Sequence, residues 1–566
     1  MTGPATDRAA GAAPAFDRDD PPVLGANPFV GLTSAQVAAA FARLGQRVAV
    51  EPGVAAATTV DAVAELLRVA VGRSDVAPER GDRRFADATW QDNPLFRRLM
   101  QGYLVRSRAA HRVVDEVALD SKSRARAHFA VSLVTEAAAP TNNLLTNPNA
   151  MAKALQTRGQ SVLAGARNFA HDLRHNGGMP SQVDTRPFAV GRNLAVSPGR
   201  VVHRTEVFEL IQYDETSPRV HRRPLVAVPP QINKYYITDL APGRSLVEST
   251  VAAGFPYFTL SWRNPTREHR DWDLDTYVSA CLEAVHVACD IAGSEDANTV
   301  GLCAGAVTLA ALLGHLAATG ESSLVNSATF LVAGLDTTAE TTATSLMSRR
   351  AVEAARARSL RRGVLAAEDM AKVFAWLRPN DLVWNYWVNN YLLGENPPAF
   401  DILYWNNDTT RLPAGLHSDF LDLYLTNGLV EGTLDVLGAP VDLGKVACDS
   451  FVVAGYTDHL IPWDGAYRTT QVLGGESRFV LSTGGHIQAI LNPPGNQRAS
   501  YLVNDALPPT AAEWRAGATQ VSGSWWPLWH EWLATRSGTT RARRRRSGNA
   551  AHPAGDAAPG RYVHLT

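Results

Sequence analysis

The hydrophobic pattern at the start of the chain is helical. From about residue 26 to 198, apolar side chains recur every three to four residues, as one buried helix face requires. Ser34 precedes one such run, and Asn93-Pro94 has the residue types of a helix cap and first helical position before Leu95–Val114. These positions predict a mostly α-helical N-terminal domain over 26–198.

The period of the pattern shortens after residue 198. Short apolar, partly β-branched runs alternate with helical stretches up to about 336, and strand patterns return at 450–455 and 479–481. The earlier runs are Val207–Ile211, Pro224–Val228, Tyr257–Leu260, Thr299–Leu302 and Ala328–Val332. Strands that alternate with helices indicate βαβ units and a parallel sheet. The pattern therefore predicts an α/β domain over 199–566.

Three segments follow neither pattern. Residues 1–25 are rich in Ala, Pro, Gly and Asp, which predicts a disordered tail. The aromatic and Asn-rich range 337–445 breaks the strand rhythm and predicts a lid, or cap, inserted over the sheet. The range 537–560 contains Arg541 and Arg543–Arg546, a charge run that predicts a flexible, solvated segment, with binding to anionic lipid or nucleic acid as the alternative.

Composition limits the partners and the compartment. The chain has 566 residues, 45% apolar and 19% charged, with a net charge of −1, so nucleic acid is not an expected partner. Its four cysteines lack C-x-x-C spacing, and its N-terminus does not resemble a secretory signal. These features predict a reducing cytoplasm in which thiols stay free.

One uncharged stretch, 297–320, is long enough to resemble a membrane span. Polar residues such as Asn298 and His315 interrupt it, and no positively charged flank supports insertion. A buried strand that leads into a buried helix explains the same composition. We therefore expect no transmembrane segment.

The most informative motif is Gly301-Leu302-Cys303-Ala304-Gly305, between a predicted strand and a predicted helix. A nucleophile exposed on a strained strand-to-helix turn needs small residues on both sides, because larger side chains would collide with the neighbouring strand and helix. The alternative is a buried, inert cysteine in a glycine-rich chain. The motif predicts that Cys303 is a catalytic nucleophile.

Two further polar residues follow predicted strands. Asp458 comes after 450–455, and His486 comes after 479–481. Sites in open α/β sheets lie at the carboxyl ends of the strands. Taken singly, Asp458 could cap a turn and His486 could be a core imidazole. Together with Cys303 they have the chain order of the α/β-hydrolase fold, nucleophile, acid, histidine, which predicts a catalytic triad.

Several longer tracts resemble the polyhydroxyalkanoate synthases over most of the chain. These tracts are Pro140–Asn142, Pro229–Tyr236, Ser261–Pro265, the Cys303 motif, Asp458–Trp463, Gly485–Ile487 and Asn492–Pro494. The tracts Arg378–Tyr391, Trp405–Pro413 and Ser524–Trp526 resemble the single-subunit class II enzymes associated with medium-chain monomers. Many relatives have Gly where this chain has Ala306, a small change at a helix start.

The resemblance implies an acyltransferase that polymerises 3-hydroxyacyl-CoA thioesters. His486 would take the proton of Cys303, and the thiolate would attack the thioester to give an acyl-enzyme. Asp458 would either orient His486 or act as the base for the next 3-hydroxyl, and His459 would be structural. The backbone N–H of Ala304, and by resemblance that of Ile232, would bind the oxyanion. No cofactor and no metal is expected.

The resemblance also implies a homodimer, with 337–445 taking part in the contact. The product is an apolar polyester, so we expect the enzyme in the cytoplasm at the surface of polyester inclusions, where the N-terminal domain would contact that surface or granule-associated proteins. A polyester depolymerase or an acyl-CoA thioesterase would share the fold and triad order but admit water to the acyl-enzyme. A noncatalytic granule protein would be expected to lose a triad member, and none is missing here.

Overall fold

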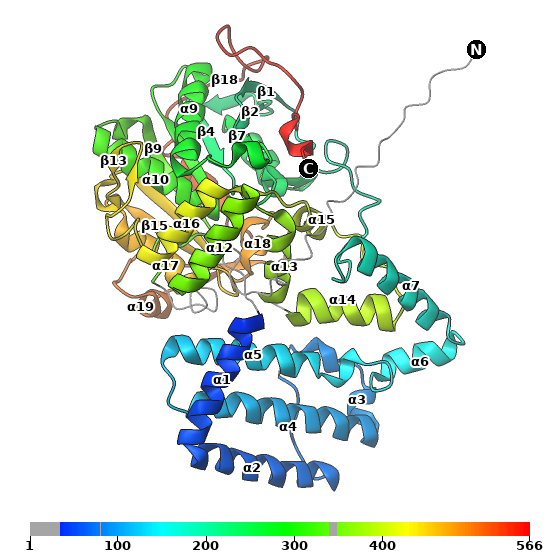
Figure 1. The fold of residues 1–566 in the computed structure, drawn as a ribbon. Coiled ribbons are helices and arrows are strands. Elements are labelled where there is room, and N and C mark those ends of the chain that lie inside the picture. The colour runs from blue at the N-terminus through cyan, green and yellow to red at the C-terminus, as the bar shows by residue number, and fades with distance from the viewer. Residues whose placement is uncertain (1–33, 80, 339–347, 378) are drawn as a thin grey trace, which may run out of the picture. The chain divides into compact units, whose positions relative to one another are not determined.

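The computed structural model describes residues 34–79, 81–338, 348–377 and 379–566, so the predicted tail, 1–25, lies outside the described residues. The described chain forms two compact units (Figure 1). A helical unit contains residues up to Gln182 together with Ala375–Pro398. An α/β unit contains Val183–Phe374 and Ala399–Thr566.

The first part of the helical unit is a set of helices, several of which begin at a polar cap. They are α1 (Ser34–Val50), α2 (Pro52–Ala70), η1 (Arg83–Phe85), α3 (Thr89–Asp92), α4 (Pro94–Glu116), α5 (Ser121–Ala137), η2 (Pro140–Asn142), α6 (Pro148–Gln156) and α7 (Gln160–His175). The Asn93 side chain accepts hydrogen bonds from the backbone N–H groups of Leu95 and Phe96, which satisfies two donors at the start of α4. The helix cap and first position read from Asn93-Pro94 are thus confirmed.

The aromatic segment Ala375–Pro398 also packs within the helical unit. Two π-helical turns, η6 (Asn380–Trp384) and η7 (Val388–Leu392), flank α14 (Asn385–Trp387). The Tyr391 hydroxyl donates to the buried Asp172 carboxylate, and a Cβ built on Gly165 would lie 1.9 Å from the Tyr391 carbonyl oxygen. The sequence predicted one insertion over the sheet for 337–445, whereas this part of it supplies apolar partners for α7.

The α/β unit is built on a ten-stranded sheet in the order β1-β2-β7-β4-β8-β9-β14-β15-β16-β17. Its strands are β1 (Gly199–Arg204), β2 (Phe208–Tyr213), β7 (Tyr257–Trp262), β4 (Leu225–Val228), β8 (Ala297–Leu302), β9 (Val325–Leu331), β14 (Asp449–Gly455), β15 (Ser477–Ser482), β16 (Ser500–Val503) and β17 (Thr519–Ser522). Strands β7 to β15 of this order are parallel, and β1, β2, β16 and β17 pair antiparallel. The sheet is therefore mixed, with the predicted parallel sheet at its centre.

Short strand pairs and helices complete the unit. The pairs are β3 (Arg219–His221) with β18 (Thr540–Ala542), β5 (Asp239–Ala241) with β6 (Arg244–Ser245), β10 (Val364–Leu365) with β11 (Leu412–Pro413), and β12 (Asp435–Val436) with β13 (Ala439–Pro440). The helices are α8 (Leu246–Ala252), α9 (Leu274–Ala292), α10 (Ala304–Thr319), α12 (Arg349–Arg362), α13 (Ala367–Leu377, in this unit up to Phe374), α15 (Asp401–Asn407), α16 (Ala414–Thr426), α17 (Trp463–Val472), α18 (His486–Ile490), α19 (Ala511–Ala516) and α20 (Trp526–Ala534).

Alternating strand residues divide the core into two layers. Phe208, Val452 and Phe330 belong to the layer that includes α9, α10, α16 and α17, whereas Ile211 and Val453 belong to the layer that includes α8 and α20. This period of two is the expected consequence of a sheet covered on both faces. The uncharged stretch 297–320 forms β8 and α10 inside this core, as predicted. Among the helices that the structure describes, none is long and apolar enough to cross a membrane.

The basic segment near the C-terminus makes specific contacts, although the sequence predicted a flexible, solvated run. Arg541 in β18 donates two hydrogen bonds to the buried Glu215 carboxylate, which also accepts from the backbone N–H of Arg544. The Arg544 guanidinium donates to the Ala292 carbonyl at the end of α9. A buried carboxylate needs such partners, which is why these arginines are held in place.

Candidate active site

Cys303 lies on a strained turn between β8 and α10. Its backbone has φ 48° and ψ −120°, in a region that residues with a Cβ rarely adopt. Its N–H donates to the Leu331 carbonyl of the adjacent strand β9 at 2.9 Å, and its carbonyl accepts from the Ala306 N–H. The turn presents a half-buried thiol at the carboxyl end of the sheet, at the N-terminus of α10.

The two glycines of the motif are required by backbone packing. A Cβ on Gly301 would lie 2.6 Å from the Ala306 Cα. A Cβ on Gly305 would lie 2.3 Å from the Val228 carbonyl oxygen and 2.5 Å from that of Pro229, at the end of β4. Neither contact is possible without movement of the backbone. The glycines therefore let β4, β8 and α10 meet closely, as the sequence predicted for such a turn.

Asp458 and His486 meet beside this turn. Asp458 follows β14, His486 begins α18 after β15, and the His486 Nδ1 lies 2.6 Å from the Asp458 Oδ2. The other carboxylate oxygen of Asp458 accepts from the backbone N–H groups of Leu460 and Ile461 at 2.8 and 3.0 Å. With both oxygens engaged, the carboxylate fixes the plane of the imidazole. His459 next to it is exposed.

The pKa of His486 depends on both Asp458 and Cys303. Burial lowers the pKa of His486, but the Asp458 carboxylate and Cys303, which is also its hydrogen-bond partner, outweigh burial and raise this pKa above its ordinary value of 6.5. Burial alone would raise the pKa of Asp458. The charge of His486 and the hydrogen bonds that Asp458 accepts outweigh burial, so this pKa lies below its ordinary value of 3.8. Since Nδ1 faces Asp458, the other ring nitrogen of His486 is the one available to Cys303. The structure thus brings together the three residues that the sequence singled out.

The other three thiols lie outside this arrangement. Burial raises the pKa of Cys281, and it raises that of Cys289 and of Cys448 to about 12. Thiols of this kind stay protonated and unreactive at neutral pH. No group of three or more His, Cys, Asp or Glu side chains in the described part of the chain is arranged to hold a metal ion.

The two expected oxyanion donors come from different elements. Ala304 is the first residue of α10, where helix N–H groups have no partner within the helix. Ile232, 5% exposed, follows β4, whose final carbonyls contact the α10 turn at Gly305. This places the 229–232 segment beside the start of α10.

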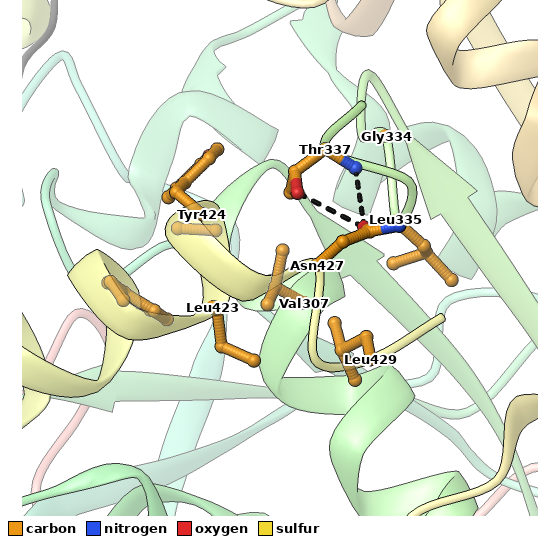
Figure 2. A pocket seen from close by; sticks show the side chains of 10 residues that line it. Val307, Gly334, Leu335, Thr337, Leu423, Tyr424, Asn427 and Leu429 are labelled. Carbon is orange, nitrogen blue, oxygen red and sulfur yellow. Dashed lines mark hydrogen bonds between the residues drawn. The ribbon is translucent and has the colours of Figure 1, made fainter. Parts of the chain in front are cut away.

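A small, mainly apolar cavity lies next to Ala304 (Figure 2). It is lined by Ala304, Val307, Gly334, Leu335, Thr337, Phe420, Leu423, Tyr424, Asn427 and Leu429. Its volume of about 20 Å³ is room for about one water molecule. At one end, the Asn427 Oδ1 accepts hydrogen bonds from the N–H and hydroxyl of Thr337.

Tyr424 lies near Cys303 and lines the cavity, which the sequence did not indicate. It lies on α16, and burial raises its pKa, with a further increase from the nearby Cys303. Figure 2 shows Tyr424 on the same helix as Leu423, with Asn427 just after the helix end. Nothing in the periodicity of 414–426 points to Cys303, because the proximity of Tyr424 to Cys303 arises from tertiary packing alone.

Comparison with sequence models identifies both parts of the chain. A model described as the N-terminus of poly-beta-hydroxybutyrate polymerase (PhaC) matches residues 81–250. A model of the alpha/beta hydrolase fold matches residues 239–493, in agreement with the strand order and with the positions of Cys303, Asp458 and His486.

Curated relatives match nearly the whole chain. Poly(3-hydroxyalkanoate) polymerase 2 of Ectopseudomonas oleovorans is 50% identical over 88% of this chain and 89% of its own length. Poly(3-hydroxyalkanoate) polymerase 1 of the same organism is 45% identical over 96% and 97%, respectively. The poly(3-hydroxyalkanoate) polymerase subunit PhaC of Cupriavidus necator is 41% identical over 88% and 85%. The chain belongs to the poly(3-hydroxyalkanoate) polymerase family.

Proposed function

We propose that this protein polymerises 3-hydroxyacyl-CoA thioesters into a polyhydroxyalkanoate and releases CoA, through an acyl-cysteine intermediate on Cys303. The observation that carries the proposal is the contact between a strained elbow thiol and the His486–Asp458 pair, in a chain of this family. A thiol nucleophile suits the reaction, because exchange of one thioester for another keeps the acyl group activated for the next transfer.

In the acylation step His486 accepts the proton of Cys303, and the thiolate attacks the thioester carbonyl. The N–H groups of Ala304 and Ile232 stabilise the oxyanion of the tetrahedral intermediate. As the carbon–sulfur bond to CoA breaks, the imidazolium returns its proton to the departing thiolate. CoA leaves as a thiol, and the acyl group stays on Cys303.

In elongation the 3-hydroxyl of the acceptor attacks the acyl-cysteine carbonyl, the carbon–sulfur bond to Cys303 breaks, and the hydroxyl proton passes by way of a base to the departing Cys303 thiolate. Either His486 or Asp458 would accept that proton. The contacts of Asp458 support an orienting role, since its two carboxylate oxygens are bound by His486 and by the N–H groups of Leu460 and Ile461. We assign the proton acceptor in both steps to His486.

The preferred monomers in this proposal are medium-chain. Support comes from the tract Trp405–Pro413 and from the apolar lining of the cavity beside Ala304. A medium-length alkyl chain is far larger than the present volume of about 20 Å³, so α16 and the residues around Leu429 must move to admit it. A homodimer, action at the surface of cytoplasmic polyester inclusions, and contacts of the N-terminal helices with that surface or its associated proteins also belong to this proposal.

The test combines free-thiol release with product analysis. Purified enzyme is given 3-hydroxyacyl-CoA of several chain lengths, and CoA release is followed together with polymer turbidity. We expect both signals from the unmodified protein, with a preference for medium-chain substrates, and neither from Cys303→Ala. Cys448→Ala, which removes a thiol outside the triad, serves as the matched control and should keep both signals.

The products separate the alternatives. CoA release with free hydroxy acid as the only product would contradict the polymerase assignment and indicate an acyl-CoA thioesterase. Polymer formation by Cys303→Ala would refute the nucleophile assignment. A polyester depolymerase would consume added polymer without any dependence on CoA thioesters.

A further inference from the structure

A segment far along the chain binds the loop that contains Ile232. We call residues 229–236 the oxyanion loop and residues 405–411, at the end of α15 and beyond, the cap segment. Their contacts are the hydrogen bonds Thr410 Oγ1 to Gln231 O (2.5 Å), Thr410 N to Ile232 O (3.3 Å), Trp405 Nε1 to Lys234 O (2.7 Å) and Tyr236 Oη to Asp408 Oδ2 (2.8 Å), and a β-bridge between Asn233 and Thr409. The cap segment thus contacts the oxyanion loop along most of its length.

Thr410 makes the most informative of these contacts. Its side chain is buried, with 2% exposure, and its hydroxyl donates to the carbonyl oxygen of Gln231. That carbonyl and the N–H of Ile232 are the two ends of one planar peptide group. The hydroxyl of Thr410 therefore contacts the same peptide group that would bind the oxyanion.

Two physical effects follow from this placement. First, Thr410 donates two hydrogen bonds to the loop, from its hydroxyl to the Gln231 carbonyl and from its N–H to the Ile232 carbonyl. Together these bonds fix the direction of the Ile232 N–H. Second, hydrogen bonds in a chain polarise one another, so donation to the Gln231 carbonyl makes the Ile232 N–H a stronger donor. Both effects favour the charged oxyanion over the neutral ground-state carbonyl.

The side chain of Gln231 connects the same peptide to the other donor. Its Nε2 donates to the Thr308 hydroxyl at 2.9 Å, and that hydroxyl donates to the Ala304 carbonyl at 3.4 Å. Gln231 is 2% exposed and Thr308 is fully buried. Gln231 thus links the oxyanion loop, through Thr308, to the first turn of α10. These bonds help to fix the distance between the N–H groups of Ile232 and Ala304.

We propose that Thr410 is a positioning residue that orients and strengthens the oxyanion-binding N–H of Ile232; this rests on the proposed function. Because Thr410 belongs to the cap segment, the oxyanion site is complete only while that segment is bound to the loop. Movement of the cap segment away from the loop lowers acyl-transfer activity even though Cys303, His486 and Asp458 stay in place.

The experiment compares two reactions of the same thiol. Acylation by 3-hydroxyacyl-CoA passes through an oxyanion, whereas alkylation of Cys303 by iodoacetamide does not. We expect Thr410→Val to lower the first-turnover rate of CoA release by about 10- to 100-fold, with little change in KM. The alkylation rate should stay within about twofold, since the thiol and its partners are unchanged. Thr410→Ser keeps the hydroxyl and should recover most of the acylation rate.

The matched control is Thr470→Val, which removes another buried hydroxyl that donates to a backbone carbonyl, that of Tyr467 in α17. It should leave both reactions near the original rates. Equal losses of acylation and alkylation in Thr410→Val would mean a collapsed site and would overturn the proposal, as would an unchanged acylation rate. If the unmodified enzyme acylates but yields only free hydroxy acid, the polymerase function fails while the Thr410 comparison remains valid.

Discussion

The two sides of this active site are held in place by different means. The elbow, Gly301–Ala306, is fixed by close backbone packing of β4, β8 and α10, which leaves no room for a side chain at Gly301 or Gly305. The oxyanion loop is fixed by hydrogen bonds from the cap segment, far along the chain. In the proposed mechanism the nucleophile is therefore held by the central sheet, whereas one oxyanion donor depends on a separate segment.

In the proposed mechanism the two sides have different chemical tasks. The elbow and its His486–Asp458 pair supply a reactive thiol to any electrophile. The loop and the cap segment serve only reactions that develop charge on a carbonyl oxygen. The alkylation rate of Cys303 therefore reports on the elbow side alone, and the acyl-transfer rate reports on both sides. Variants can be sorted by which of the two rates they lower.

The largest effect is expected from Asp458→Asn, on the elbow side. Loss of the carboxylate leaves the imidazolium of His486 without its main partner, and we expect acyl transfer to fall by about 10³- to 10⁴-fold. Alkylation by iodoacetamide at neutral pH should fall as well. A large loss of acyl transfer with unchanged alkylation would contradict this assignment, because it would place Asp458 on the oxyanion side.

The pH dependence of this variant has a defined sign. Asp458 raises the pKa of His486, so the unmodified protein keeps the imidazolium to a higher pH than the variant does. The ratio of the alkylation rate of the unmodified protein to that of the variant should therefore grow as pH rises and shrink toward low pH, where both imidazoles are protonated. Rate measurements between pH 5.5 and 8.5 test this; a ratio that grows toward low pH would refute it.

A smaller effect is expected from Gly305→Ala, at the boundary between the two sides. The added Cβ meets the Val228 and Pro229 carbonyls and must push the end of β4, and with it the oxyanion loop, away from α10. A displacement of about 1 Å lowers acyl transfer by about 10²-fold. Alkylation should fall much less. The control is Gly495→Ala, where a Cβ meets nothing within 4 Å, and equal activity of the two variants would show that the contact is not critical.

The sequence pointed to all the residues of the elbow side, whereas on the oxyanion side it pointed to Ala304 and Ile232 but not to the segment that binds the loop. Gly301, Cys303 and Gly305 are neighbours in the chain, and Asp458 and His486 each follow a strand with clear periodicity, so local pattern and fold order identify all of them. The antiparallel strands β1, β16 and β17 were not predicted, since part-exposed strands have weaker apolar patterns than buried parallel strands.

Contacts between distant segments have no such local signal. Thr410 binds Gln231, and Tyr424 comes near Cys303, only after the chain between them has folded. The aromatic residues of 375–398 looked like a covering for the sheet because composition shows that a segment is apolar but not which surface it contacts. The arginines at 541–544 were misjudged for the same reason, since their partner Glu215 is remote in sequence.

The smallest effect is expected from Tyr236→Phe, on the oxyanion side. This change removes the hydroxyl that donates to Asp408 in the cap segment and keeps the buried ring. One such hydrogen bond among several is worth about a 2- to 5-fold change in acyl transfer, and alkylation should not change. Tyr467→Phe, which also deletes a hydrogen bond from a buried tyrosine, to the Pro508 carbonyl, should leave both rates unaffected. A loss of alkylation in Tyr236→Phe would mean that the oxyanion loop also supports the elbow, and the two sides would then be one mechanical unit.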